Sequence, residues 1–360
     1  MPKWNIPHTA NKNVKAQPAS SALGFGKFFT DHMFVARYSR ERGWYGTEVV
    51  PYAPLAMDPG ASVLHYGQAL FEGLKAFRQS DGSISVFRPE FNWKRMTFGA
   101  GRLCMEAPPL DLWMEGLDAL LKVEQAWVPK EKGTALYIRP TLIGTESFLG
   151  VRPSNEYLFF IILSPVGAYY SEGTKPVKIW VEKGFVRAAP GGLGETKAAA
   201  NYAGSLKAAQ NAKEKGYAQV LWLDVTKTHI EEVGTMNVFF DFGDEVVTPA
   251  LDGTILEGGT RQVVIELLRE QGRKVSERKL SLSEILGAHK EGRLKEAFGT
   301  GTAAVISPIG ELSSEDFKIV FKPAEGTEWG PTATQLYKRI TDIHYGIAPD
   351  THGWLTPIKG

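Results

Sequence analysis

The first half of the chain shows two hydrophobic periods. Short runs rich in aromatic and β-branched residues, apolar at every second position, are typical of strands. Runs with an apolar residue at every third or fourth position are typical of helices. These patterns predict strands at residues 28–39, 48–52, 74–78, 84–87, 135–143 and 157–164, and helices at 62–73, from Pro89 onward and at 110–127. The polar residues 1–26 are expected to be mobile.

The second half continues the alternation of strands and helices. Its patterns predict strands at 177–182, 218–224 and 230–242, helices at 198–215 and 261–271, and a Gly/Thr-rich turn at 298–304. A break in composition over residues 165–176 favours a linker between the halves. We therefore predict a two-domain α/β protein, with domains at 1–170 and 177–360 and a linker at 171–176.

Composition and charge favour an enzyme that acts on small molecules. Lys and Arg total 41 against 40 Asp and Glu, a balance that supports neither a nucleic-acid nor a membrane partner. Cys104 is the single cysteine, which excludes an intrachain disulfide, and the seven histidines have no paired ligand spacing, so we predict no metal. No signal peptide or membrane span is evident, and a cytoplasmic location is expected.

Lys197 is the first candidate for chemistry. It follows a turn whose three glycines, within residues 190–194, permit positive φ angles and close approach of a ligand. A cation at the start of the predicted helix opposes the helix dipole, so burial would favour the neutral, nucleophilic amine. Tyr202 lies on the first turns of that helix and could point at the same space. The alternative is an ordinary surface lysine.

Two features could bind an anion. Arg95 projects from an apolar helix face and needs an anionic partner, either a structural carboxylate or a ligand phosphate. Glycines before Thr260 lead into a helix whose first N–H groups favour an anion, although Thr260 could simply be an N-cap. The turn at 298–304 could add donors.

Two pairs of polar residues lie on predicted strands. Tyr137 and Arg139 share a strand face, which could line a site or simply an outer surface. Alternation predicts that Glu231 and Glu232 point to opposite sides, one inward and one outward, with an exposed pair as the alternative.

The candidate lysine, phenol, carboxylate, arginine and the two anion-binding turns could together hold pyridoxal phosphate. A lysine would form the Schiff base, and a carboxylate would keep the pyridine nitrogen protonated. A nucleotide-binding P-loop is a poor alternative, because Thr196 stands where a glycine must precede the lysine and Ala198 where Ser or Thr must follow.

Eight segments, in this order, resemble the branched-chain amino acid aminotransferases of pyridoxal-phosphate fold type IV. They are FTDHM (29–33), LHYGQALFEGLKAF (64–77), FRPEFNWKR (87–95), YIRPTLIGTE (137–146), PGGLGETKAAANYAGS (190–205), EEVGTMNVFF (231–240), ILEGGTR (255–261) and FGTGTAAVISP (298–308). The resemblance implies a small N-terminal α/β domain, a larger C-terminal α/β domain, pyridoxal 5′-phosphate between them, and a homodimer whose partner contributes to the substrate pocket.

The resemblance also assigns roles by position. Lys197 is implied as the Schiff-base lysine that moves the substrate proton, Glu232 as the carboxylate at the pyridine nitrogen, and Tyr202 as the phenol near the ring oxygen. Other implied cofactor contacts are Arg95, Thr235, Gly259, Thr260 and Thr302. Implied substrate contacts are Phe29, Tyr66, Tyr137, Arg139, Tyr169, Thr302 and Ala303, with Tyr66 reaching in from the other subunit.

The implied reaction is the reversible transfer of the amino group of Leu, Ile or Val to 2-oxoglutarate. Arg139 is the expected partner of the second carboxylate, and Phe29 and Tyr169 are expected to form apolar walls. Two alternatives share the fold type, D-amino acid aminotransferase and aminodeoxychorismate lyase, but the FEGLK segment and Tyr137-x-Arg139 speak against both. A non-catalytic binding protein would not need Lys197.

The chain departs from its relatives in two places. Ala304 and Ser307 stand where some animal relatives carry a redox Cys-x-x-Cys pair. Glu257 and Gly259 stand where many relatives have a proline and a β-branched residue, which loosens the expected phosphate-binding turn.

Overall fold

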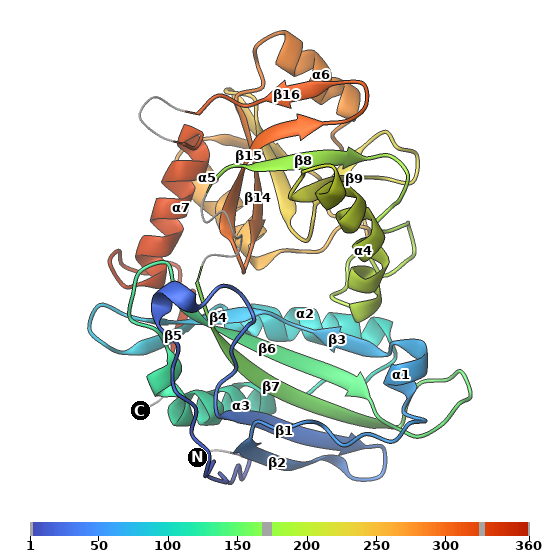
Figure 1. The fold of residues 1–360 in the computed structure, drawn as a ribbon, viewed down its shortest axis with the longest axis vertical. Helices are drawn as coiled ribbons and strands as arrows, with labels where there is room; N and C mark the ends of the chain where they lie inside the picture. Colours follow the sequence, from blue (N-terminus) through green and yellow to red (C-terminus); the bar gives the residue numbers. More distant parts are fainter. Residues whose placement is uncertain (1–2, 168–174, 324–327, 359–360) are drawn as a thin grey trace. The chain divides into compact units, whose positions relative to one another are not determined.

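The computed structural model describes residues 3–167, 175–323 and 328–358 (Figure 1). The chain divides into two compact units. The first comprises Met1–Ser171, Thr196–Ala200 and Asp342–Gly360, and the second comprises Glu172–Glu195 and Asn201–Thr341. Both combine β-sheet with α-helices, which confirms the predicted α/β class.

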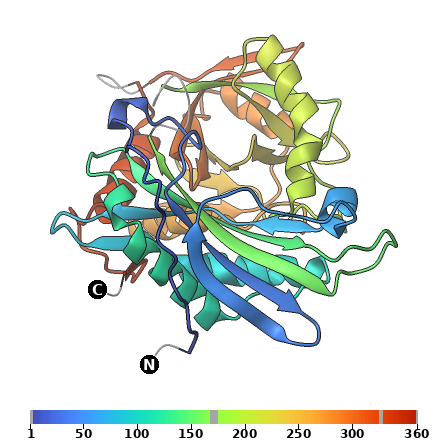
Figure 2. The same cartoon turned by 60° about the horizontal axis from the view of Figure 1, so that its bottom comes forward.

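An antiparallel sheet forms the centre of the first unit. Within the described residues it has eight strands in the order β17-β5-β4-β6-β7-β1-β2, with β3 beside β6 (Figure 2). The strands are β1 (His32–Ser39), β2 (Gly43–Pro51), β3 (Ala69–Phe71), β4 (Leu74–Arg78), β5 (Ile84–Phe87), β6 (Ala135–Gly144), β7 (Glu156–Val166) and β17 (Leu355–Pro357). The helices are α1 (Ser62–Tyr66), α2 (Pro89–Arg102) and α3 (Leu110–Val123), with 3-10 turns at Ser20–Ala22 and Gln125–Trp127.

Helix α3 packs against one face of this sheet through its apolar side (Figure 1). Trp113 is fully buried and stacks on Phe159 of β7 with ring centroids 5.7 Å apart. Gly116 lets the Phe34 ring approach the helix, because a Cβ there would overlap that ring. Since strand side chains alternate, the residues of β6 that point away from this core are free to build a site on the other face.

The second unit is built around a mixed sheet. Its described residues form nine strands in the order β10-β9-β8-β15-β14-β11-β12-β13, with β16 beside β15. The strands are β8 (Val177–Glu182), β9 (Gln219–Leu223), β10 (Ile230–Val233), β11 (Asn237–Asp241), β12 (Glu245–Thr248), β13 (Lys274–Glu277), β14 (Glu296–Gly301), β15 (Val305–Ser313) and β16 (Lys318–Val320). The helices are α4 (Ala199–Glu214), α5 (Gly259–Glu270), α6 (Leu282–Lys290) and α7 (Pro331–His344). Pairing is parallel for β8 with β9, β8 with β15, and β12 with β13.

Several predicted elements have the observed bounds, and others divide at a glycine. The strands predicted at 74–78, 84–87 and 177–182 are β4, β5 and β8. The helix predicted at 62–73 ends early because Gly67 adopts a left-handed conformation, φ 61°, and the chain continues as β3. The strand predicted at 230–242 is broken by Gly234, φ 58°, into β10 and β11.

Both ends of the chain differ from expectation. The N-terminal segment was predicted to be mobile, yet the backbone N–H groups of Lys3 and Trp4 donate to Glu115 of α3, both at 2.9 Å. The C-terminal residues were placed with the second domain, but β17 pairs with β5, so Asp342–Gly360 belong to the first unit. Residues 171–174 of the predicted linker lie outside the described residues.

No helix within the described ranges is long and apolar enough to cross a membrane.

His344 is a buried histidine in an aromatic environment. Its ring stacks on Phe77, with centroids 4.3 Å apart, and meets Phe87 edge-on at 4.5 Å. Neither ring nitrogen has a hydrogen-bond partner among the described residues. Burial, together with the charge of Lys75, lowers the pKa of His344 to about 3.

This pKa makes stability depend on pH. The unfolded chain binds a proton at His344 below about pH 6.5, whereas the folded chain excludes it, so stability is lost as pH falls from 6.5 towards 3. His344→Phe keeps the aromatic contacts and removes the proton. Denaturant unfolding should show the variant gaining about 2 kcal/mol on the wild type between about pH 7.5 and about pH 5. A difference that stays constant across this range would contradict the assignment.

Candidate active site

In the first unit, Lys197 lies against β3. The Phe71 N–H donates to the carbonyl oxygen of Lys197 at 3.2 Å, and Leu70 and Ala198 form an isolated β-bridge. The Lys197 Nζ is 4.9 Å from the centroid of the Phe71 ring. The Arg139 guanidinium lies 4.6 Å from the same centroid. An amine and a guanidinium therefore meet at one aromatic ring.

Tyr137 and Arg139 lie on the same face of β6, as the sequence predicts, and they contact each other. The Arg139 Nη2 donates to the Tyr137 hydroxyl at 3.1 Å, and the Arg139 Nε is buried with no hydrogen-bond partner among the described residues. Gly73 makes room for the phenol, because a Cβ at this position would overlap the Tyr137 hydroxyl oxygen. The alternative of an outer surface is wrong for Tyr137, which is 8% exposed, and the role of the pair in a site stays a prediction.

Arg95 of α2 has a carboxylate partner. Its Nε and Nη2 donate to the two oxygens of Glu72 at 2.7 and 2.6 Å, a bidentate ion pair whose side chains are 8% and 0% exposed. Asn92 donates to Glu72 Oε2 at 2.7 Å. Of the two partners that the sequence left open, the structural carboxylate is present, and the phosphate contact stays a prediction.

In the second unit, Glu232 is a buried carboxylate at the end of β10. It is 3% exposed, and its Oε1 accepts a hydrogen bond from the Leu256 N–H at 2.8 Å. The Nη2 of Arg187 lies 3.4 Å from the same oxygen. Glu231 is 4% exposed, so the prediction that only one of the two glutamates faces inward is wrong. Both are covered, because this sheet is packed on both sides at β10.

Helix α5 of the second unit begins at Gly259. Its N-cap is Gly258, with no side-chain cap among the described residues and no acidic residue in the first turn. The alternative of Thr260 as N-cap is therefore wrong, because Thr260 lies inside the helix. The first backbone N–H groups at this positive end of the helix dipole suit an anion.

The segment predicted as a turn at 298–304 is mostly strand. β14 continues to Gly301, and residues 302–304, which include Thr302 and Ala303, connect it to β15. Val305 follows with φ 64°, a left-handed conformation that is strained for a β-branched residue. The Thr300 hydroxyl is buried and without a hydrogen-bond partner among the described residues.

The remaining predicted residues lie as follows. Phe29 stacks on Tyr52 with centroids 5.1 Å apart, and Tyr66 ends α1, is 42% exposed, and donates to the Leu149 carbonyl. Tyr202 is half-buried on α4, and Thr235 is exposed in the turn between β10 and β11. Tyr169 lies outside the described residues.

Sequence reasoning missed three residues of these clusters. Phe71 and Glu72 lie inside the FEGLK segment, which was used as a family signature without roles for its residues. Arg187 had no local signal, because its contact with Glu232 joins positions far apart in the sequence. The described residues contain no group of three or more His, Cys, Asp or Glu side chains that could hold a metal ion.

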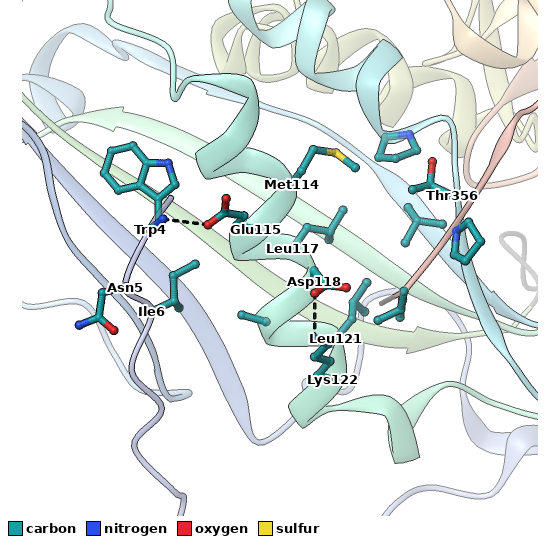
Figure 3. A pocket seen from close by; sticks show the side chains of 15 residues that line it. Trp4, Asn5, Ile6, Met114, Glu115, Leu117, Asp118, Leu121, Lys122 and Thr356 are labelled. Carbon is teal, nitrogen blue, oxygen red and sulfur yellow. Dashed lines mark hydrogen bonds and ion pairs between the residues drawn. The ribbon is translucent and has the colours of Figure 1, made fainter. Parts of the chain in front are cut away.

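A cavity of the first unit lies beside α3 (Figure 3). Its volume is about 610 Å³, and it contains none of the predicted site residues. Trp4 and Ile6 lie on one side of the helix and Thr356 on the other, with Leu117 and Leu121 between them (Figure 3).

Comparison with known proteins identifies the class. The family model described as amino-transferase class IV matches residues 69–312. The chain belongs to the class IV aminotransferases. It is 51% identical over 359 residues to branched-chain-amino-acid aminotransferase 2 of Bacillus subtilis (strain 168), an alignment that covers 99% of this chain and 98% of that relative. It is 45% identical over 334 residues to a probable branched-chain-amino-acid aminotransferase of Streptomyces coelicolor, covering 92% and 91%.

Solved structures share the fold. The branched-chain amino acid aminotransferase of Escherichia coli superposes with a TM-score of 0.76 at 25% identity, covering 91% of this chain and 99% of that one. The branched-chain amino acid aminotransferase of Thermobaculum terrenum, in its PLP-bound holo form, has a TM-score of 0.72 at 23% identity, covering 92% and 99%. The fold is therefore that of fold type IV, as predicted.

Class IV aminotransferases use pyridoxal 5′-phosphate, and the residues present fit this group. The first unit offers an amine at Lys197. The second offers a buried carboxylate at Glu232 and the N-terminus of α5. The donor set matches an aldehyde, a pyridine nitrogen and a phosphate.

Gly73→Ala tests the Tyr137–Arg139 pair. The new methyl group displaces the phenol, so the Arg139 hydrogen bond is lost and substrate carboxylates bind less well. We expect kcat/KM of transamination to fall about 10- to 100-fold, mainly through KM. Gly101→Ala on α2 is the matched control, because a Cβ there meets no neighbouring atom. Equal steady-state kinetics for the two variants would contradict the role of the pair.

Proposed function

We propose that the protein is a branched-chain L-amino acid aminotransferase. It transfers the amino group of Leu, Ile or Val to 2-oxoglutarate, giving the 2-oxo acid and L-glutamate, and the reaction is reversible. The observation that carries the proposal is that the Lys197 amine and the Arg139 guanidinium of the Tyr137–Arg139 pair meet at the Phe71 ring. An amine beside a guanidinium supports an amine for the chemistry next to a group suited to a carboxylate. Identities of 51% and 49% to the two Bacillus subtilis branched-chain enzymes support the substrate class.

When bound, pyridoxal phosphate supplies a carbonyl group that takes up the amino group and a ring that accepts the electron pair of the broken Cα–H bond. Lys197 would accept the proton of the substrate Cα at its Nζ and release it again, so that one amine serves as base and then as acid. Glu232 would hold a proton at the pyridine nitrogen.

The other cofactor contacts hold the group in place. The backbone N–H groups of Gly259 and Thr260, at the start of α5, bind the phosphate together with Thr302. Arg95 adds a charge to the phosphate while Glu72 fixes its orientation. Cofactor contacts from Tyr202 and Thr235 complete the assignment.

Substrate recognition follows from the same face of β6. Tyr137 and Arg139, with the turn at Thr302 and Ala303, bind carboxylates, and Arg139 is the reversible partner that accepts the second carboxylate of 2-oxoglutarate. Phe29 and Tyr169 form apolar walls for aliphatic side chains. One pocket then serves both substrates without leaving a buried charge unpaired.

We propose a homodimer in which Tyr66 reaches the partner's substrate pocket. Tyr66 lies among exposed apolar side chains of the first unit, and such patches mark interaction surfaces. The patch contains Leu64, Tyr66, Phe148, Leu149 and Val151, which are 42–85% exposed. Sedimentation velocity should give the mass of two chains, and the mass of one chain would contradict the proposal.

A cytoplasmic location is proposed from the single cysteine, which suits a reducing compartment. Cell fractionation checks it, and recovery with an oxidising compartment would contradict it.

Lys197→Ala tests the central assignment. Without the amine, no group moves the substrate proton, so turnover of L-leucine should fall about 10³-fold or more, while cofactor binding stays measurable. Lys207→Ala, which removes an exposed lysine of α4, is the control and should keep wild-type rates. Normal turnover by the Lys197 variant would overturn the proposed function.

A further inference from the structure

Arg187 is a buried arginine of the second unit that touches three oxygen atoms. Its side chain is 8% exposed. Its Nη2 lies 3.4 Å from Glu232 Oε1, and it donates to the carbonyl oxygen of Gly194 at 3.2 Å and to that of Thr254. One guanidinium therefore joins a carboxylate to two backbone segments.

These segments are the ones that lead to the proposed site. Gly194 comes shortly before Lys197, and Thr254 comes two residues before Leu256, whose N–H donates to Glu232 Oε1 at 2.8 Å. A Cβ at Gly194 would overlap the Thr254 carbonyl, so the two segments touch. Arg187 thus holds the carboxylate and the backbone that positions it.

Two buried carboxyl groups, those of Glu231 and Glu232, interact with the one positive charge of Arg187. Glu231 and Glu232 are both buried, and the Arg187 guanidinium contacts Glu232. Burial raises the pKa of Glu231, the charges of Asp252 and Glu232 raise it further, and the Thr254 hydroxyl and Arg187 oppose this. Burial therefore favours the neutral form of Glu231, whereas the Glu232 carboxylate has the Arg187 Nη2 3.4 Å from its Oε1.

We propose that Arg187 is a positioning residue that holds the Glu232 carboxylate ionised and oriented for the pyridine nitrogen of the cofactor. The proposal rests on the proposed function, because it uses the assignment of Glu232. All three oxygens are contacted by the one nitrogen Nη2. An arginine suits this buried position because its guanidinium keeps its charge, whereas a buried lysine shifts its pKa readily.

Affinity for pyridoxamine 5′-phosphate measures this role directly. This ligand forms no covalent bond with Lys197, so titration of the apoprotein by calorimetry reports non-covalent contacts alone. In Arg187→Met the buried carboxylate loses its counter-charge and favours the neutral form, so affinity should fall about 10- to 100-fold. Arg187→Lys restores the charge without the fork and should recover most of this loss.

Glu231→Gln is the matched control. It replaces a neighbouring buried carboxyl group with a neutral side chain of the same shape, and affinity should stay within about twofold of the wild type. An effect as large as that of Arg187→Met would contradict the assignment of Glu232 as the charged partner. Thermal unfolding of each apoprotein checks that the variants are folded.

A double-mutant cycle separates positioning from general stability. If Arg187 acts through Glu232, Arg187→Met should cause no additional loss of pyridoxamine-phosphate affinity in a Glu232→Gln background. Losses that add, or an unchanged affinity in Arg187→Met, would overturn the proposal. Should Arg187→Met fail to fold, the same cycle is run with Arg187→Gln, which also removes the charge but keeps a polar side chain.

If the proposed function is wrong, the experimental result differs from the result expected if only the role of Arg187 is wrong. A wild-type protein that binds pyridoxal phosphate but does not transaminate L-leucine refutes the substrate assignment and leaves the cycle interpretable. In kinetics, the Arg187 variants should lower kcat with little change in the KM for L-leucine, because Arg187 does not contact substrate.

Discussion

The ion pair between Glu72 and Arg95 is the interaction on which the candidate site residues of the first unit depend. Glu72 is completely buried, and its carboxylate receives two hydrogen bonds from Arg95 and one from Asn92. Removing one partner of such a pair costs about 3–5 kcal/mol, because the other charge stays buried. The pair fixes the connection between β3 and β4 against α2. It thereby places Phe71, which contacts Lys197, and Gly73, which makes room for Tyr137.

The second unit also contains a buried ion pair between a carboxylate and an arginine, at Glu232. A charged carboxylate inside a protein needs a counter-charge and hydrogen-bond donors, and Glu232 has Arg187 and the Leu256 N–H. In both units the arginine and the carboxylate lie on segments that are separated in the sequence, Glu72 with Arg95 and Glu232 with Arg187. Each buried ion pair therefore holds two chain segments together. The candidate site residues on those segments are positioned by this contact.

Much of this arrangement could be predicted from sequence, and the limits have physical causes. The hairpin of β4 and β5 and the shared face of Tyr137 and Arg139 depend on local periodicity, which a sequence displays. The end of α1 at Gly67 depends on a single left-handed residue, which periodicity does not register. The roles of Glu72 and Arg187 depend on partners distant in sequence. No local pattern marks such residues, so only the folded structure shows them.

The same distinction applies to the ends of the chain. Residues 1–26 are polar, and polarity alone predicts mobility, yet backbone N–H groups near the N-terminus find carboxylate partners on α3. The last strand, β17, is three residues long and adds to the edge of the first sheet. Both contacts are long-range, and neither needs a pattern that could be recognised in advance.

The most direct test of the account is the visible absorption spectrum of the purified holoenzyme before and after a single amino acid is added without a 2-oxo acid acceptor. The account predicts that L-leucine converts the yellow pyridoxal form to the pyridoxamine form and that D-leucine leaves it unchanged. Conversion by D-leucine alone, or a colourless protein that takes up no added pyridoxal phosphate, would contradict it.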